Sequence, residues 1–322
     1  MSKKNFTPIP PAAELPDAEE IDVEQVLKDY VDGNIDIICV VGPTASGKTR
    51  YAVELARKIN RLNPELGAEI LSADSRQVYR GMDIGTGKDL CEYGEIPYHL
   101  IDIVDAGTKY NIFEYQRDFE AAYKDVVERG KVPILCGGSG LYIEAATCGY
   151  SLPEVPPDPE LRAELESRPT EELIAKLAEL KPLHNSTDYD TRKRLIRALE
   201  IAIYEAGHPV NMSHFLPKKA YFIGTLVDRE TRNARIDRRL EARLQEGMVE
   251  EIRGIIDSGV PAEDLIYYGL EYKFVTLYII GANSYDEMKN LLATAIHQFA
   301  KRQMTWFRGM ERKGIEIHWT KV

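Results

Sequence analysis

One run of residues has the types and spacing that bind phosphate. GPTASGKT, from Gly42 to Thr49, fits the pattern G-x-x-x-x-G-K-[ST] and lies between an apolar stretch and a helical pattern, as a phosphate-binding P-loop requires. Its glycines let backbone N–H groups surround an anion, Lys48 adds a positive charge, and the Thr49 hydroxyl can ligate Mg²⁺. We expect a phosphate or diphosphate site made of Gly42, Pro43, Thr44, Ala45, Ser46, Gly47, Lys48 and Thr49. The motif alone leaves open NTP hydrolysis, phosphoryl transfer and binding of another diphosphate.

A second chemical candidate, Asp74, ends the apolar run AEILSAD. In parallel sheets functional groups gather at the carboxyl ends of strands, so Asp74 is expected beside the P-loop. It could coordinate Mg²⁺ or act as a general base towards a bound nucleophile. Asp102 and Asp105 are weaker acidic candidates, for which a loop role is expected. Ser139, in the Gly-rich end of the next strand, offers one donor and one acceptor, and a turn is an equal alternative there.

The elements that must position these residues alternate between strands and helices. Apolar runs of strand length occur at 35–41, 68–74, 132–136, 221–227 and 315–319. Helical patterns occur at 50–59, 111–130, 229–257 and 286–308, two of them opened by cap patterns at Asn111 and Ser284. This alternation predicts an α/β fold, a P-loop NTPase-like parallel sheet covered by helices.

The predicted sheet is interrupted once and preceded by an acidic segment. Residues 151–214 open with a Pro-rich run and continue as polar helical segments, which predicts a small all-helical insertion domain between core segments 35–150 and 215–322. Residues 1–34 carry eight acidic residues against three lysines, a net charge of −5, and we expect a mobile extension with one packing helix at 23–31.

Composition limits the class of protein. No apolar run approaches the length of a membrane span, so a cytoplasmic protein without membrane contact is expected. The four cysteines lack metal-ligand spacing, which argues against a zinc site. The net charge of −11 argues against a uniformly basic, nucleic-acid-binding surface. Basic residues nevertheless gather on three predicted helical stretches, where they favour a polyanion partner, although solvated faces with acidic neighbours would look the same. The first stretch carries Arg232, Arg239 and Arg243. The second carries His297, Lys301 and Arg308, with Thr305 on the same helix face. The third carries Arg192, Lys193, Arg194 and Arg197.

Five motifs in order, GPTASGKT, LSADSRQVYRGMDIGTGK, GGSGLY, RALE and AKRQMTWFRG, resemble those of the tRNA dimethylallyltransferase (isopentenyltransferase) family. The similarity runs from about Ile35 to Trp319. It implies transfer of a dimethylallyl group from dimethylallyl diphosphate to N6 of adenine-37, next to the anticodon of tRNA, with release of diphosphate. The P-loop would then hold the diphosphate, with Mg²⁺ near Thr49, and we expect the enzyme to be a monomer.

The resemblance also implies roles for single residues. Asp74 matches the general base, Thr44 the threonine near the bridging oxygen of the donor, and Arg239 the arginine that contacts the diphosphate. The residues expected to contact tRNA are Asp74, Ser75, Arg76, Gln77, Ser139, Arg162, Lys193, Arg194, Arg197, His297, Lys301, Arg302 and Gln303.

This chain departs from the family pattern at several positions. GTGKD, with Gly87, replaces the usual GTAKP, and Glu271 and Phe274 flank Tyr272-Lys273 where the family reads G-Y-K-E. Ser139 replaces a threonine, His297 replaces an arginine, and the loop LHNSTDYDTRKR has unusual spacing. Two other functions remain open at this point. One is prenylation of free AMP, ADP or ATP, against which the insertion and the AKRQ helix argue, and the other is a P-loop nucleotide kinase or nucleotide-binding regulatory protein.

Overall fold

The computed structural model describes residues 15–150, 155–181, 191–207 and 215–322. The chain divides into two compact units, and each is described by itself. The sheet unit takes residues up to Cys148 and from Pro217 onwards, and the helical unit takes Gly149–Leu216. The boundaries expected from the sequence lie after residues 150 and 214. Most of the unusually spaced loop before Arg192 lies outside the described residues.

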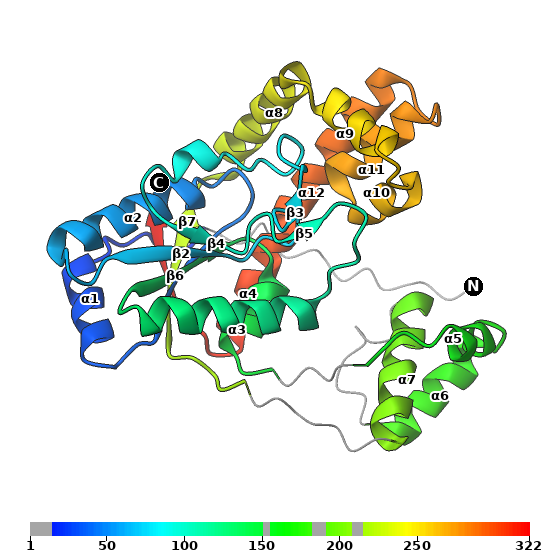
Figure 1. Cartoon of the computed structure of the whole chain (residues 1–322), viewed down its shortest axis with the longest axis horizontal. Helices are drawn as coiled ribbons and strands as arrows, with labels where there is room; N and C mark the ends of the chain where they lie inside the picture. Colours follow the sequence, from blue (N-terminus) through cyan, green and yellow to red (C-terminus); the bar gives the residue numbers. More distant parts are fainter. Residues whose placement is uncertain (1–14, 151–154, 182–190, 208–214) are drawn as a thin grey trace, which may run out of the picture. The chain divides into compact units, whose positions relative to one another are not determined.

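Six parallel strands form the main sheet of the sheet unit, in the order β4-β2-β6-β1-β7-β8 (Figure 1). They are β1 (Ile37–Val41), β2 (Ala68–Ser72), β4 (Tyr98–His99), β6 (Val132–Gly137), β7 (Ala220–Leu226) and β8 (Ile317–Lys321). All five strands expected from the sequence are present. A second small sheet pairs β3 (Tyr79–Arg80) with β5 (Val104–Asp105), and these strands and β4 were not expected because their runs are too short to show a period.

Residues of β1 alternate between two hydrophobic cores, as the two-residue period of a strand requires. Ile38 and Val40 pack with helices α1 (Val23–Val31) and α2 (Lys48–Leu62) on one face of the sheet. Ile37, Cys39 and Val41 pack on the other face with α3 (Ile112–Glu128) and α4 (Gly140–Thr147). The expected N-terminal helix is therefore part of the sheet unit, with Val23, Val26 and Leu27 buried.

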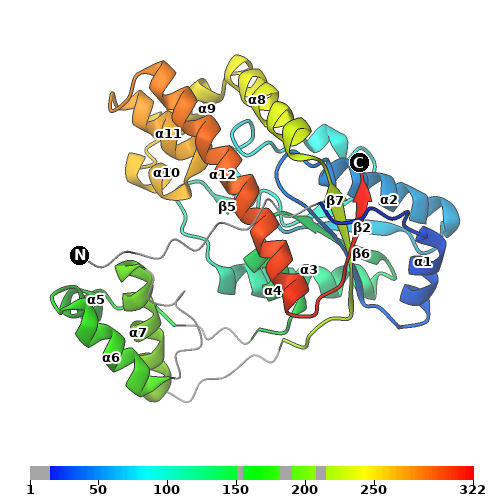
Figure 2. The same ribbon diagram turned by 180° about the vertical axis from the view of Figure 1, so that it is seen from behind.

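Five further helices extend the second core: α8 (Arg229–Glu246), α9 (Met248–Asp257), α10 (Ala262–Tyr268), α11 (Leu270–Ile279) and α12 (Tyr285–Arg312). Figure 2 shows α12 running from this helical group past α4, and the two helices are in contact. The single helix expected at 229–257 is wrong. Gly247 adopts a left-handed backbone, φ 104°, which ends α8 and turns the chain into α9. The capping boxes expected at Asn111 and Ser284 are confirmed.

The helical unit contains α5 (Pro159–Glu166), α6 (Thr170–Leu180) and α7 (Arg192–Gly207). Its own core is formed mainly by leucines, among them Leu165, Leu173, Leu177, Leu195 and Leu199. Every regular element described in this unit is a helix, as the sequence predicts.

Candidate active site

The P-loop links buried β1 to the N-terminus of α2. Gly47, with φ 83°, and Ala45, with φ 61°, take the left-handed backbone that this tight loop needs. Ser46 is fully buried and shares a hydrogen bond of 2.6 Å with Thr225 on β7. Burial lowers the pKa of Lys48. A desolvated ammonium at a helix N-terminus favours an anionic ligand, which is the chemistry that the motif predicts.

Three distant segments meet at Thr44. Its backbone amide donates to Gln303 Oε1 on α12 at 2.8 Å, and Gln303 Nε2 donates to the Gly138 carbonyl oxygen at 2.9 Å. From α8, Arg239 donates to the Thr44 hydroxyl oxygen. Gln303 was expected to contact tRNA, but here it is 7% exposed and both ends of its amide bind the protein. It therefore joins the P-loop to the end of β6.

Asp74 lies two residues beyond β2, and one of its two carboxylate oxygens accepts a hydrogen bond from the protein. Its Oδ1 accepts from the backbone amide of Arg76 at 2.9 Å, which fixes the orientation of the carboxylate. Within the described part of the chain, Oδ2 accepts no hydrogen bond. The neighbouring Ser75 amide donates to the Ser139 hydroxyl oxygen at 3.2 Å, so the ends of β2 and β6 are tied together. The carboxylate thus keeps an oxygen that can accept a proton.

A cavity of about 440 Å³ connects these residues. Its polar wall includes Thr44, Asp74, Ser139, Arg239 and Glu271. Its apolar wall comes from α11, a helix that was not expected, and from α12. The residues are Leu270, Tyr272 and Phe274 on α11 and Ile296 and Phe299 on α12. The arrangement can hold a ligand with an anionic end and a small hydrocarbon end.

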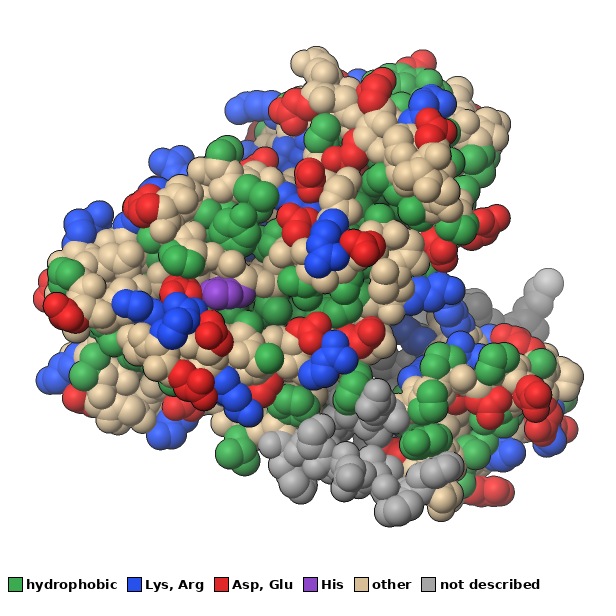
Figure 3. Space-filling view, viewed as in Figure 1, with side chains coloured by type: hydrophobic (Ala, Val, Ile, Leu, Met, Phe, Trp, Pro, Cys, Tyr) green, Lys and Arg blue, Asp and Glu red, His purple; other side chains and the backbone are tan. Residues whose placement is uncertain are grey.

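Burial changes the pKa values of two charged groups in the cavity wall, Arg239 and Glu271. Burial, followed by the nearby charge of Arg243, lowers the pKa of Arg239 to about 10. Burial also raises the pKa of the Glu271 carboxyl group, against the opposing effect of Arg243. Of the expected basic stripe of Arg232, Arg239 and Arg243, the last two residues line this cavity, and Arg243 is buried. On the face seen in Figure 3, basic and acidic side chains are mixed.

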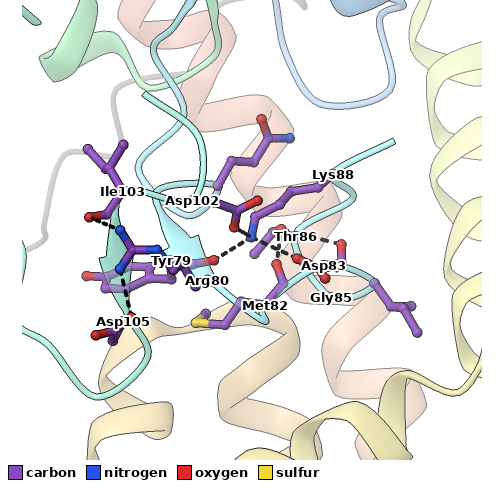
Figure 4. Close-up of polar contacts among 12 residues, drawn as sticks. Tyr79, Arg80, Met82, Asp83, Gly85, Thr86, Lys88, Asp102, Ile103 and Asp105 are labelled. Carbon is purple, nitrogen blue, oxygen red and sulfur yellow. Dashed lines mark hydrogen bonds and ion pairs between the residues drawn. The ribbon is translucent and has the colours of Figure 1, made fainter. Parts of the chain in front are cut away.

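The segment between β3 and β5 is held by ion pairs (Figure 4). The buried Lys88 ammonium binds the Tyr79 carbonyl oxygen and the carboxylates of Asp83 and Asp102. Asp105 binds Arg80 Nη1 at 2.8 Å. Asp102 lies in a loop, as expected, whereas Asp105 is the last residue of β5.

Glu251 on α9 is a functional candidate that the sequence did not reveal. Its carboxylate accepts hydrogen bonds of 2.9, 2.7 and 3.1 Å from the backbone amides of Asp83, Ile84 and Gly85. It also accepts from the Tyr272 hydroxyl at 2.7 Å. Because Gly85 and Tyr272 both line the cavity, Glu251 holds two parts of its wall. Nothing in the spacing distinguishes this glutamate from its neighbours on the helix.

The remaining residues expected to contact tRNA fall on both units. On α12, Lys301 and Arg302 are exposed, and His297 Nε2 lies 2.8 Å from Asp237 Oδ1. Arg76 lies with its guanidinium 5.9 Å from the Tyr268 ring centroid, and Gln77 donates to the Gly87 carbonyl oxygen.

In the helical unit, Lys193 and Arg194 are exposed, whereas Arg162 and Arg197 both bind buried Glu200. Arg192 binds Glu166, Thr170 and three backbone carbonyl oxygens, so it holds α7 to α5 and α6.

Comparison with known proteins gives a consistent result. The family model described as IPP transferase matches residues 77–310. tRNA dimethylallyltransferase 1 of Porphyromonas gingivalis is 58% identical over 287 residues, which are 88% of this chain and 93% of the relative. The protein of the same name from Parabacteroides distasonis is 57% identical over 288 residues, 88% of this chain and 92% of the relative.

Two solved structures are also similar to this chain. A full-length tRNA isopentenylpyrophosphate transferase from Bacillus halodurans has a TM-score of 0.62 and 33% identity, covering 89% of each chain. A eukaryotic dimethylallyltransferase acting on tRNA has a TM-score of 0.70 and covers 88% of this chain and 73% of its own; at 22% identity it supports the fold alone. In the part of the chain that the structure describes, no helix is both long and apolar enough to cross a membrane.

Proposed function

This chain belongs to the IPP transferase family and transfers a dimethylallyl group to adenine-37 of tRNA, and we propose that it takes the group from dimethylallyl diphosphate and places it on N6. The observation that carries the proposal is a single cavity that contains Thr44, Asp74 and Arg239 beside an apolar wall. The diphosphate binds the P-loop amides, Lys48 and Arg239. The dimethylallyl group packs against Leu270, Phe274 and Phe299.

The proposed reaction uses the chain's own residues as follows. The C1–O bond of the donor breaks as the N6–C1 bond forms, and the electron pair of the broken bond leaves with the diphosphate. Asp74 orients the amine and accepts its proton through the carboxylate oxygen that is unengaged in the described structure. Arg239 and Thr44, already hydrogen-bonded to each other, stabilise the charge on the departing bridging oxygen.

We also propose a magnesium ion at the P-loop. The hydroxyl of Thr49 is a hard oxygen ligand of the kind that Mg²⁺ prefers. Among the described residues no cluster of three His, Cys, Asp or Glu side chains could hold a metal, so the other ligands would be phosphate oxygens and water. When bound, the ion would neutralise negative charge on the leaving diphosphate.

The acceptor is held by residues of both units in this proposal. Ser75, Arg76, Gln77 and Ser139 lie next to Asp74 in the chain or at the neighbouring strand end and would contact the target nucleotide. On α12, His297, Lys301 and Arg302 would bind phosphates of the anticodon stem-loop, and Lys193 and Arg194 would do so in the helical unit. Gln303, Arg162 and Arg197 bind protein groups and would support these contacts instead of making them.

The deciding experiment incubates the protein with labelled dimethylallyl diphosphate, Mg²⁺ and either unmodified tRNA or AMP, ADP and ATP. Label should appear in tRNA, should require adenine at position 37, and should be lost with EDTA. A tRNA with guanine at that position is the matched control. Label found only in free nucleotides would contradict the tRNA assignment, and label in neither, with turnover of ATP, would favour a P-loop kinase.

A further inference from the structure

Arg243 has unused hydrogen-bonding capacity inside the cavity. Its side chain comes from α8 and lines the cavity wall, and the residue is only 6% exposed. Its one described ion pair is a long one, 3.9 Å from Nη1 to Glu271 Oε1. Within the described ranges its guanidinium donates no hydrogen bond to the protein. A guanidinium group has five N–H donors, so Arg243 can still bind an anion that enters the cavity.

Two positions at which this chain departs from the family pattern meet at Arg243. A Cβ atom at Gly87, where GTAKP has alanine, would overlap the Arg243 guanidinium. Gly87 also has φ +63°, a conformation that suits glycine. The partner carboxylate comes from Glu271, where the family has glycine. One substitution therefore makes room for the guanidinium, and the other supplies its counter-charge.

Arg239 lies one helical turn before Arg243 on the same side of α8, and both line the cavity. Like charges at this spacing destabilise a helix, and burial increases the repulsion. Arg239 reaches Thr44 of the P-loop, so the two arginines form a cationic pair next to the expected diphosphate site. Planar guanidinium groups bind phosphate oxygens in bidentate fashion.

We propose that Arg243 is a second arginine that binds the diphosphate of the donor, that Glu271 positions its guanidinium, and that Gly87 provides the space for it. The inference rests on the proposed donor. A small diphosphate suits a residue that is almost fully buried within the cavity better than a backbone phosphate of tRNA does.

The test compares Michaelis constants for donor and tRNA with inhibition by inorganic diphosphate. Arg243→Gln alone would leave Glu271 buried and uncompensated, so the main variant is the double change Arg243→Gln with Glu271→Gln. It should raise both the donor KM and the inhibition constant of diphosphate by about 10- to 100-fold, the loss expected for charge-assisted hydrogen bonds. The tRNA KM should stay within about twofold. Arg238→Gln, an exposed position on the same helix, is the matched control.

Two milder variants keep the test decisive if the double variant unfolds. Arg243→Lys retains the charge and should lose part of the affinity, and Gly87→Ala should displace the guanidinium and raise the same two constants. Unchanged donor KM and diphosphate inhibition in the folded variants would overturn the inference, as would a rise confined to the tRNA KM. If the unaltered protein neither transfers the prenyl group nor binds diphosphate, the proposed donor itself is wrong.

Discussion

Two pairs of arginines, one pair in each unit, have different surroundings. In the sheet unit, Arg239 and Arg243 line a cavity and bind few protein groups. In the helical unit, Arg162 and Arg197 both bind Glu200, whose side chain is 2% exposed. In these two pairs the same residue type thus provides ligand-binding capacity in one case and internal bonding in the other.

The difference has an energetic reason. An arginine that is desolvated without full hydrogen bonding destabilises the fold, and only a large core can tolerate it. The sheet unit has two such cores, one on each face of its sheet. In the helical unit the described residues form one core, and the ion pairs of Arg162 and Arg197 offset the cost of burying the Glu200 carboxylate. Basic residues found by sequence alone cannot be assigned to either role, since only their surroundings distinguish them.

The largest effect is expected at Asp74. Asp74→Asn keeps the size of the side chain but removes its ability to take a proton from N6, so single-turnover transfer should fall by about 10³-fold or more. Binding of inorganic diphosphate, measured by calorimetry, should change little. Asp105→Asn, which alters an exposed ion pair with Arg80, is the control. Near-normal transfer by Asp74→Asn would remove this residue from the role of base.

Arg239→Gln should have the next largest effect. Loss of a preorganised donor to the leaving group should lower kcat by about 10²- to 10³-fold under saturating donor. Arg162→Gln, a matched change in the helical unit, should leave donor KM unaltered. If both variants lower kcat equally at saturating donor and tRNA, the contrast between the two units is wrong.

A change in stability is expected at Glu200. Burial favours a higher pKa for its carboxyl group, but the hydrogen bonds from Arg162, the Asp158 amide and Arg197 outweigh that effect, so the pKa is lowered. The carboxylate therefore contributes stability above its unfolded pKa of about 4.3, and the contribution is lost as the pH falls towards the lower folded value.

Glu200→Gln should lower the free energy of unfolding by about 2 kcal/mol at pH 7. Loss of a fully buried ion pair would cost more, but here solvent screens the partly exposed arginines. Urea unfolding at pH 7 and below pH 4 measures the difference, which should shrink in acid. Glu179→Gln, a change at an exposed position of α6, is the control. Equal stability of Glu200→Gln and the unaltered protein at pH 7 would contradict a structural role for this ion-pair network.

The smallest effect concerns Lys193, exposed on α7. Lys193→Gln should raise the tRNA KM by about two- to fivefold at low salt, less at high salt, without changing the donor KM. Lys58→Gln on α2 in the sheet unit provides the comparison. An altered donor KM, or an effect that salt leaves unchanged, would show that Lys193 does not bind phosphates of the tRNA.

Much of the fold was predictable because it depends on local patterns. Five of the six strands of the main sheet and the caps at Asn111 and Ser284 follow from periodicity and capping chemistry. The break at Gly247 was missed because helical periodicity continues on both sides of it. Helices α10 and α11 were missed for a similar reason, since short segments carry a weak periodic signal.

The sequence by itself determined the phosphate-binding loop and the position of Asp74 at a strand end, because a P-loop is contiguous and strand ends converge in any parallel sheet. Only the tertiary structure decided that Gln303 joins the P-loop to β6, that Glu251 holds two parts of the cavity wall, and that Arg243 faces Glu271 within the cavity. These residues come from segments far apart in the chain. Their roles depend on which side chains become desolvated together when those segments pack, and no local pattern records that.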